Sequence, residues 1–136
     1  MIAAFLGWSH HADAIGQEIR NMYVVVETWT PKPAFFAAAE KTRNDLFAGI
    51  QEAMKQLADI GFVTLGWGRV EPAAHSASYE WFAVWQAPSR EVADVFLNGV
   101  ESSGWYTYFA QTNVVGELRP AEGVMAEHLA LEAEVQ

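Results

Sequence analysis

Four strand-like segments and two helical segments follow one another in the order β-α-β-β-α-β, and this order constrains the fold more than any other feature. The strand-like segments are rich in β-branched and aromatic residues, which favour strands. They are residues 23–30, 62–71, 78–87 and 112–119. Proline follows all four of them, and it should end the first, third and fourth, because proline cannot donate to the hydrogen-bond ladder.

The two helical segments show apolar residues at spacings of three and four. In the first, residues 34–60, one apolar stripe faces a charged side, and Gly61 is placed to end the helix. The stripe consists of Leu46, Phe47, Ile50, Met54 and Leu57. The second, residues 90–102, follows Ser89, a good N-cap. Gly104 should break it, and the aromatic block 105–109 could add a further helical turn.

This order is the split βαββαβ pattern of the ferredoxin-like fold. It predicts an α+β protein with a four-stranded antiparallel sheet and both helices on one face. Alternation along the third strand separates Phe82 and Val84 from the opposite set, and we expect the first pair to pack on the helices. The opposite set is Tyr79, Trp81, Ala83 and Trp85. A bare aromatic face is normally covered, so a homodimer with facing sheets is expected.

A chain of 136 residues has room for one domain. We assign residues 23–119 to this domain and residues 1–22 to an N-terminal extension, with a short helix predicted over 13–21. Residues 120–136 form an acidic tail, which is predicted to be helical.

Composition excludes several classes of protein. Hydrophobic residues make up 51% of the chain, enough to exclude disorder as the main state. The formal net charge of −9 argues against nucleic-acid and anionic-membrane partners. With no cysteine, disulfides and thiol nucleophiles are excluded. No apolar run approaches the roughly 20 residues of a membrane span, and no signal peptide is evident, so a cytoplasmic location is expected.

The pattern over residues 23–119 resembles the dimeric α/β-barrel superfamily, which includes antibiotic-biosynthesis monooxygenases, stress-responsive barrel proteins and polyketide cyclases. The resemblance is carried by YVVVETWT, FVTLGWGRVE, SYEWFAVWQA and the GWYTYF block before TNVVG. It implies paired ferredoxin-like protomers with a pocket between sheet and helices for a small hydrophobic or aromatic molecule. Because the members use different chemistries and no catalytic set matches residue by residue, no residue role is carried over.

Two classes of function therefore stay open. One is a cofactor-independent oxygenase, cyclase or isomerase. The other is a non-catalytic dimeric binding or stress-related interaction module. A haem-using member would require a histidine on the pocket wall, and neither predicted helix of the domain contains one. We expect no cofactor.

His75 is the first catalytic candidate, because imidazole can accept and donate protons near neutral pH. It lies in the connector between the second and third strands, where a surface histidine without function is the alternative. Tyr79 or Tyr106 would orient the substrate. Further side chains could line a cavity for a flat ligand, although aromatic residues are equally typical of a dimer interface. These candidate ligand-binding residues are Trp67, Trp81, Trp85, Trp105, Tyr108 and Asn113.

Glu27 is a polar residue inside a predicted strand. If it pointed into an apolar pocket its pKa would rise, and it would become a candidate general base. The alternative is a solvent-facing carboxylate or an ion pair with Arg69 or Arg119. The adjacent His10 and His11 are a weak metal-ligand pattern, and no metal site is expected.

Overall fold

The computed structural model describes residues 22–133, so the helix expected over 13–21 lies outside the described residues. The chain divides into two units, Tyr23–Gly116 and a second that contains the segment from Glu117 onward. The domain elements run in the order expected from the sequence, with the first predicted helix divided in two and the further helical turn after Gly104 present. They are β1 (Tyr23–Pro31), α2 (Pro33–Ala37), α3 (Glu40–Asp59), β2 (Val63–Arg69), β3 (Trp81–Ala87), α4 (Arg90–Ser102), α5 (Trp105–Tyr108) and β4 (Phe109–Glu117).

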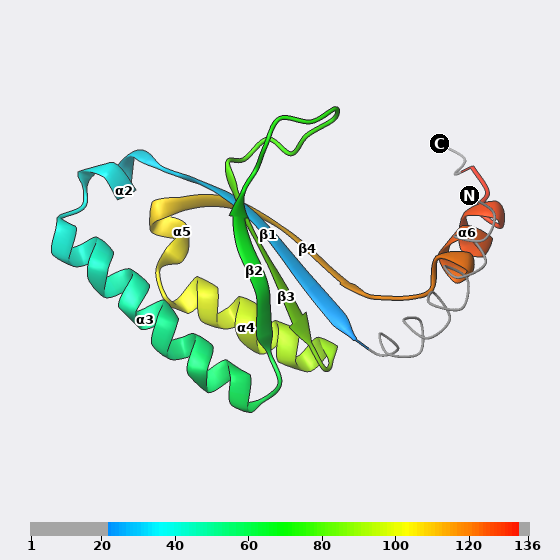
Figure 1. Ribbon diagram of the computed structural model, residues 1–136, viewed down its shortest axis with the longest axis horizontal. Coiled ribbons are helices and arrows are strands. Elements are labelled where there is room, and N and C mark those ends of the chain that lie inside the picture. The colour runs from blue at the N-terminus through cyan, green and yellow to red at the C-terminus, as the bar shows by residue number, and fades with distance from the viewer. Residues whose placement is uncertain (1–21, 134–136) are drawn as a thin grey trace, which may run out of the picture. The chain divides into compact units, whose positions relative to one another are not determined.

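The strands form one four-stranded antiparallel sheet in the order β2-β3-β1-β4. Helices α3 and α4 lie side by side on one face of it (Figure 1). The expected α+β class is therefore confirmed. None of the described helices is both long enough and apolar enough to cross a membrane.

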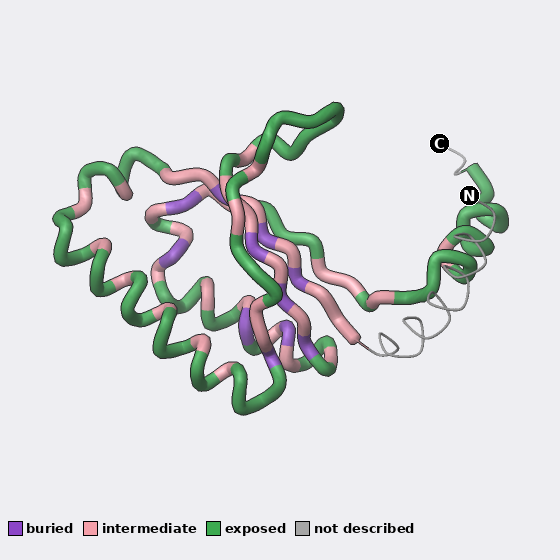
Figure 2. Tube along the Cα trace, in the orientation of Figure 1, coloured by how far each residue is buried: buried purple, intermediate pink, exposed green. Residues whose placement is uncertain are grey.

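The buried residues of β1 and β3 occupy alternate positions along each strand (Figure 2). Their side chains face the helices, since the Trp85 ring lies 4.9 Å from that of Phe96 in α4. In β1 they are Val25, Glu27 and Trp29, and in β3 they include Trp85, which is 2% exposed. Val25 pairs with Trp85 across the ladder.

The predicted orientation of β3 is therefore wrong. Trp81, Ala83 and Trp85 face the helices, whereas Phe82 and Val84 lie on the other face. Alternation shows which side chains share a face but not which face is covered. Contacts distant in sequence decide it, because the Trp85 ring lies 4.9 Å from that of Phe96 in α4 and 5.2 Å from that of Phe62.

The long helix predicted over 34–60 is split between α2 and α3. Ala38 takes an extended conformation with ψ 143°, although alanine is a good helix former. The break allows the Phe35 ring to pack 5.0 Å from that of Phe109, with Arg43 4.9 Å above it. Tertiary packing thus overrides local preference at this point.

The residues predicted to cap or end the helices act as expected. The Ser89 hydroxyl accepts from the Val92 N–H and caps α4. Gly61 and Gly104 have φ of +88° and +84°, and they follow α3 and α4 in the left-handed conformation that glycine adopts readily. In the second unit, α6 (Ala121–Leu129) lies in the segment expected to be helical.

Phe62, Trp85 and Phe96 form the stacked centre of the core. The Phe62 ring is 5.2 Å from Trp85 and 4.4 Å from Phe96, and Phe62 is 1% exposed. By contrast, Leu65 sits at a register shift in β2 and is 61% exposed.

We predict that Phe62→Ala lowers the free energy of unfolding by about 3–5 kcal/mol, because it deletes a buried ring and leaves a cavity. Urea denaturation measures this loss. Leu65→Ala is the matched control and should change stability by less than about 0.5 kcal/mol. Equal losses in the two variants would contradict this description of the core.

Candidate functional site

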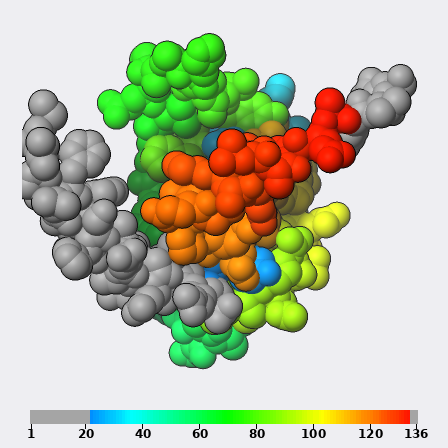
Figure 3. All heavy atoms as spheres, turned by 90° about the vertical axis from the view of Figure 1, so that its right-hand side faces the viewer, coloured from blue at the N-terminus to red at the C-terminus, as the bar shows by residue number. Residues whose placement is uncertain are grey.

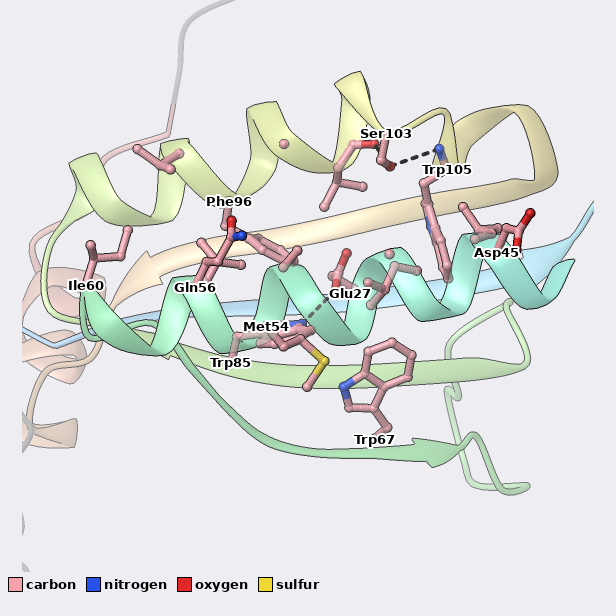
Figure 4. Close-up of a pocket in the computed structure, with 18 residues that line it drawn as sticks. Glu27, Asp45, Met54, Gln56, Ile60, Trp67, Trp85, Phe96, Ser103 and Trp105 are labelled. Atoms are coloured by element: carbon pink, nitrogen blue, oxygen red, sulfur yellow. Dashed lines mark hydrogen bonds between the residues drawn. The ribbon is translucent and has the colours of Figure 1, made fainter. Parts of the chain in front are cut away.

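A cavity of about 580 Å³ lies between α3, α4 and the inner face of the sheet (Figure 4). The helices contribute mainly apolar side chains, and the sheet together with α5 contributes Glu27 and three indoles. The apolar helix residues are Leu46, Ile50, Ala53, Met54, Leu57, Ile60, Val95, Phe96 and Val100. This is the space between sheet and helices in which the resemblance to the dimeric α/β-barrel superfamily implies a pocket.

One glycine on each helix faces the cavity. Gly49 of α3 and Gly99 of α4 both line it, and a Cβ built on either one meets no atom within 4 Å. Glycine inside a helix costs about 1 kcal/mol relative to alanine. Both residues are exposed, so they leave the open side of the cavity unobstructed, although a larger residue would fit there and would favour the helix.

Glu27 is the buried polar residue of this wall, at 5% exposed. Its two carboxylate oxygens each accept one short hydrogen bond. Trp85 Nε1 donates to Oε1 at 2.6 Å, and Gln111 Nε2 donates to Oε2 at 2.6 Å. Figure 4 shows the carboxylate between α3 and the sheet, with the bond to Trp85 dashed.

The network continues beyond Glu27 through Gln111. The Gln111 Oε1 accepts from Trp105 Nε1 at 2.7 Å, and its Nε2 also donates to Asn113 Oδ1 at 2.8 Å. A chain of hydrogen bonds thus joins β3, β1, β4 and α5. Every donor in this chain is neutral. Within the described part of the protein, no cationic side chain forms a hydrogen bond or ion pair with the Glu27 carboxylate.

Burial raises the pKa of Glu27 above its ordinary value of 4.5, because the low-dielectric surroundings disfavour the charged form. The hydrogen bonds from Trp85 and Gln111 act in the opposite direction, and burial has the larger effect. Glu27 therefore lies at an apolar pocket with a raised pKa, which is the condition that the sequence analysis set for a general base.

Three indoles form the aromatic wall. Trp67 of β2 is 5.8 Å from Trp85 of β3, with the rings 69° apart. Trp29, behind the wall, contacts Trp67 at 5.2 Å and Trp105 at 5.7 Å. The four rings therefore make one continuous cluster.

The position of Trp105 depends on α5. Lys32, directly after β1, holds α5 in place through two hydrogen bonds. The Lys32 backbone N–H donates to the Tyr108 carbonyl at 2.8 Å, and its Nζ donates to the Tyr106 carbonyl at 2.9 Å. The Trp105 ring then stacks on Phe109 at 4.0 Å.

The structure brings together some of the residues singled out in the sequence. Trp67, Trp85 and Trp105 line the cavity, and Asn113, although exposed, joins the network through Gln111. Three others are half-buried and do not line the cavity. These are Trp81, which stacks with Arg69, and the α5 residues Tyr106 and Tyr108.

His75 and Tyr79 lie elsewhere, in the connector over residues 70–80, which stands out from the sheet as a separate lobe (Figures 1 and 3). His75 is exposed and has φ +54°, and Tyr79 is half-buried. Neither lines the cavity. Their proposed acid–base and orienting roles gain no support from this geometry.

Sequence reasoning missed Gln111, Gly49 and Gly99. Gln111 fell outside the predicted strand, which began one residue later. A strand starting at Phe109 would have placed Phe109, Gln111 and Asn113 on one face. The two glycines lie within helical patterns, where they carried no signal of their own. Among the described residues, no group of three His, Cys, Asp or Glu could hold a metal ion.

We predict that Glu27 makes stability fall as pH rises. Because its folded pKa is above 4.5, the folded state holds the proton longer than the unfolded state does. As the pH rises from the ordinary pKa of glutamate to the raised pKa of the folded state, the unfolding free energy of the wild type should decrease relative to that of Glu27→Gln. Above the raised pKa the difference should level off. Urea denaturation of both proteins across this range measures the difference. A difference that is constant with pH would contradict the prediction.

Sequence comparison places this site within a family. No curated protein matches the chain with significance. Residues 22–131, most of the chain, match a family of unknown function, DUF6616, and the protein belongs to this family.

Proposed function

We propose that the protein binds a small, flat, mainly apolar molecule in the cavity between α3, α4 and the sheet, where Glu27 accepts a hydrogen bond from it. The observation that carries the proposal is a buried carboxylate set into an otherwise apolar, indole-lined wall. Ligand sites of roughly 300–1,000 Å³ commonly combine apolar walls with a few convergent polar groups. The cavity of about 580 Å³ has this make-up.

The glycines support the same proposal. Alanine at Gly49 or Gly99 would meet no atom within 4 Å and would favour each helix. Open volume at a cost in stability is typical of a site kept for a ligand.

As an enzyme, the protein would use Glu27 rather than His75 as general base. Its carboxylate would take a proton from a weakly acidic C–H or O–H group of the substrate, and its raised pKa makes it a stronger base than a solvated glutamate. Of the oxygenase, cyclase and isomerase classes, isomerisation fits best. A single base that removes a proton from one carbon and returns it to another completes that reaction.

The non-catalytic alternative is a module that holds a hydrophobic metabolite. It shares the cavity and the hydrogen bond to Glu27 but requires no proton transfer. Exchange of a ligand C–H for deuterium in heavy water, lost in Glu27→Gln, would separate the enzyme from the binding module. The cytoplasmic location stays a prediction.

We also propose that the domain is ferredoxin-like and pairs with a second copy through its open face, as in the dimeric α/β-barrel superfamily. The strand order and the position of α3 and α4 on one face support this. On β1 and β3, the face that these helices leave uncovered carries mainly aliphatic, aromatic and threonine side chains, all half-buried. They are Val24, Val26, Thr28, Phe82, Val84 and Gln86.

Filling the cavity should abolish ligand binding. We predict that Gly49→Leu and Gly99→Leu each weaken binding of naphthylmethanol, a neutral flat probe, by at least about tenfold, which corresponds to about 1.4 kcal/mol. Isothermal titration calorimetry measures the affinity. Gly123→Leu in α6, outside the cavity lining, is the control and should bind like the wild type. Unchanged affinity in both cavity variants would overturn the proposal.

The pairing has its own test. Val84→Glu places a charge at the middle of the open face, and we predict that it converts a wild-type dimer to monomer in sedimentation analysis. Phe36→Glu alters an exposed residue of α2 and should leave the dimer intact. A monomeric wild type, or a dimeric Val84→Glu variant, would refute pairing through this face.

A further inference from the structure

We propose that the ligand of this cavity carries a cationic group, such as a protonated amine, that pairs with Glu27 and lies against the indole rings. The inference rests on the proposed binding function and names the class of molecule bound.

The charges that line the cavity are of one sign. Glu27 and Asp45 are acidic, and no Lys, Arg or His is among the described residues that line it. Asp45 already has a partner, since Lys41 Nζ lies 2.7 Å from its carboxylate on the exposed side of α3. Glu27 is thus the lining acid whose charge is not compensated by an ion pair.

An uncompensated buried carboxylate is costly, and a cationic partner offsets that cost. The hydrogen bonds of Glu27 come from an indole and an amide, which carry no net charge. A carboxylate oxygen can accept two hydrogen bonds. Each oxygen of Glu27 accepts one from the protein, so each keeps acceptor capacity for an ammonium N–H.

The indoles add a second attraction for a cation. Tryptophan has the most favourable ring face for cation–π contact. Trp67, Trp85 and Trp105 all line the cavity, and Trp67 is 42% exposed, so part of its surface is open to a ligand. Carboxylate and indole rings together favour an ammonium group over a neutral donor.

The same features disfavour anions. A carboxylate or phosphate ligand would meet the charge of Glu27 and find no basic partner on the wall. The formal net charge of −9 also creates a field that attracts cations and repels anions during approach.

The test compares three probes that share one ring system and differ in charge: naphthylmethylamine, naphthylmethanol and naphthoate. With the full chain in calorimetry near neutral pH, the amine should bind at least about tenfold more tightly than the alcohol. Naphthoate should bind least. An alcohol that binds as tightly as the amine would overturn the cationic class and leave the proposed binding function standing. Absence of binding by all three would contradict that function itself.

Two variants test whether Glu27 or Asp45 causes the preference for the amine over the alcohol. Glu27→Gln should bring the amine and the alcohol to within about threefold of each other. Asp45→Asn, which removes the rim charge already paired with Lys41, should keep the wild-type preference. If Asp45→Asn removes the preference and Glu27→Gln does not, the assignment to Glu27 is wrong.

Trp67→Leu gives an independent measurement, because this ring is partly exposed and its loss is less disruptive to folding. The variant should weaken the amine by a larger factor than the alcohol. An equal loss for both probes would show that Trp67 contributes only apolar contact.

Discussion

The hydrogen-bonded carboxylate of Glu27 is the interaction on which the arrangement of this domain depends. It is buried between the helices and the sheet, where a charged group without hydrogen-bond partners would be costly. Trp85 supplies one bond and Gln111 the other, and Trp105 in turn bonds to Gln111. One side chain therefore orients groups from two further strands and from α5. Two of the three indoles of the aromatic wall are preorganised in this way, since Trp85 and Trp105 have few alternative orientations that satisfy their N–H groups.

The relation between helices and sheet explains why this layer is hollow. α3 and α4 present mainly aliphatic side chains and Phe96 to a sheet that presents indoles, with Gly49 and Gly99 among them. These side chains do not fill the space completely. A core of this kind would ordinarily be packed to a density that leaves few voids larger than a water molecule.

Much of the fold was predictable because local chemistry determines it. Ser89, Gly61 and Gly104 act through the backbone of their own turns, so their roles follow from short sequence windows. The face of β3 and the break before α3 depend on contacts distant in sequence. Trp85 turns inward because it packs on Phe62 and Phe96 and bonds to Glu27. Ala38 leaves the helix because Phe35 packs on Phe109. The sequence predicted the kind of site, because Trp67, Trp85 and Trp105 were candidate ligand-binding residues. Glu27 was a candidate on the condition that it faced an apolar pocket. Gln111 was missed because it lay one residue beyond a predicted boundary.

The aromatic wall also has a practical consequence. Three of the six tryptophans in the chain line the cavity, and two of these have their ring nitrogens tied into the network around Glu27. Indole emission responds to the polarity and hydrogen bonding of its surroundings. The protein therefore carries a built-in optical reporter at the place where an occupant would sit, and libraries of unlabelled metabolites can be screened against it directly.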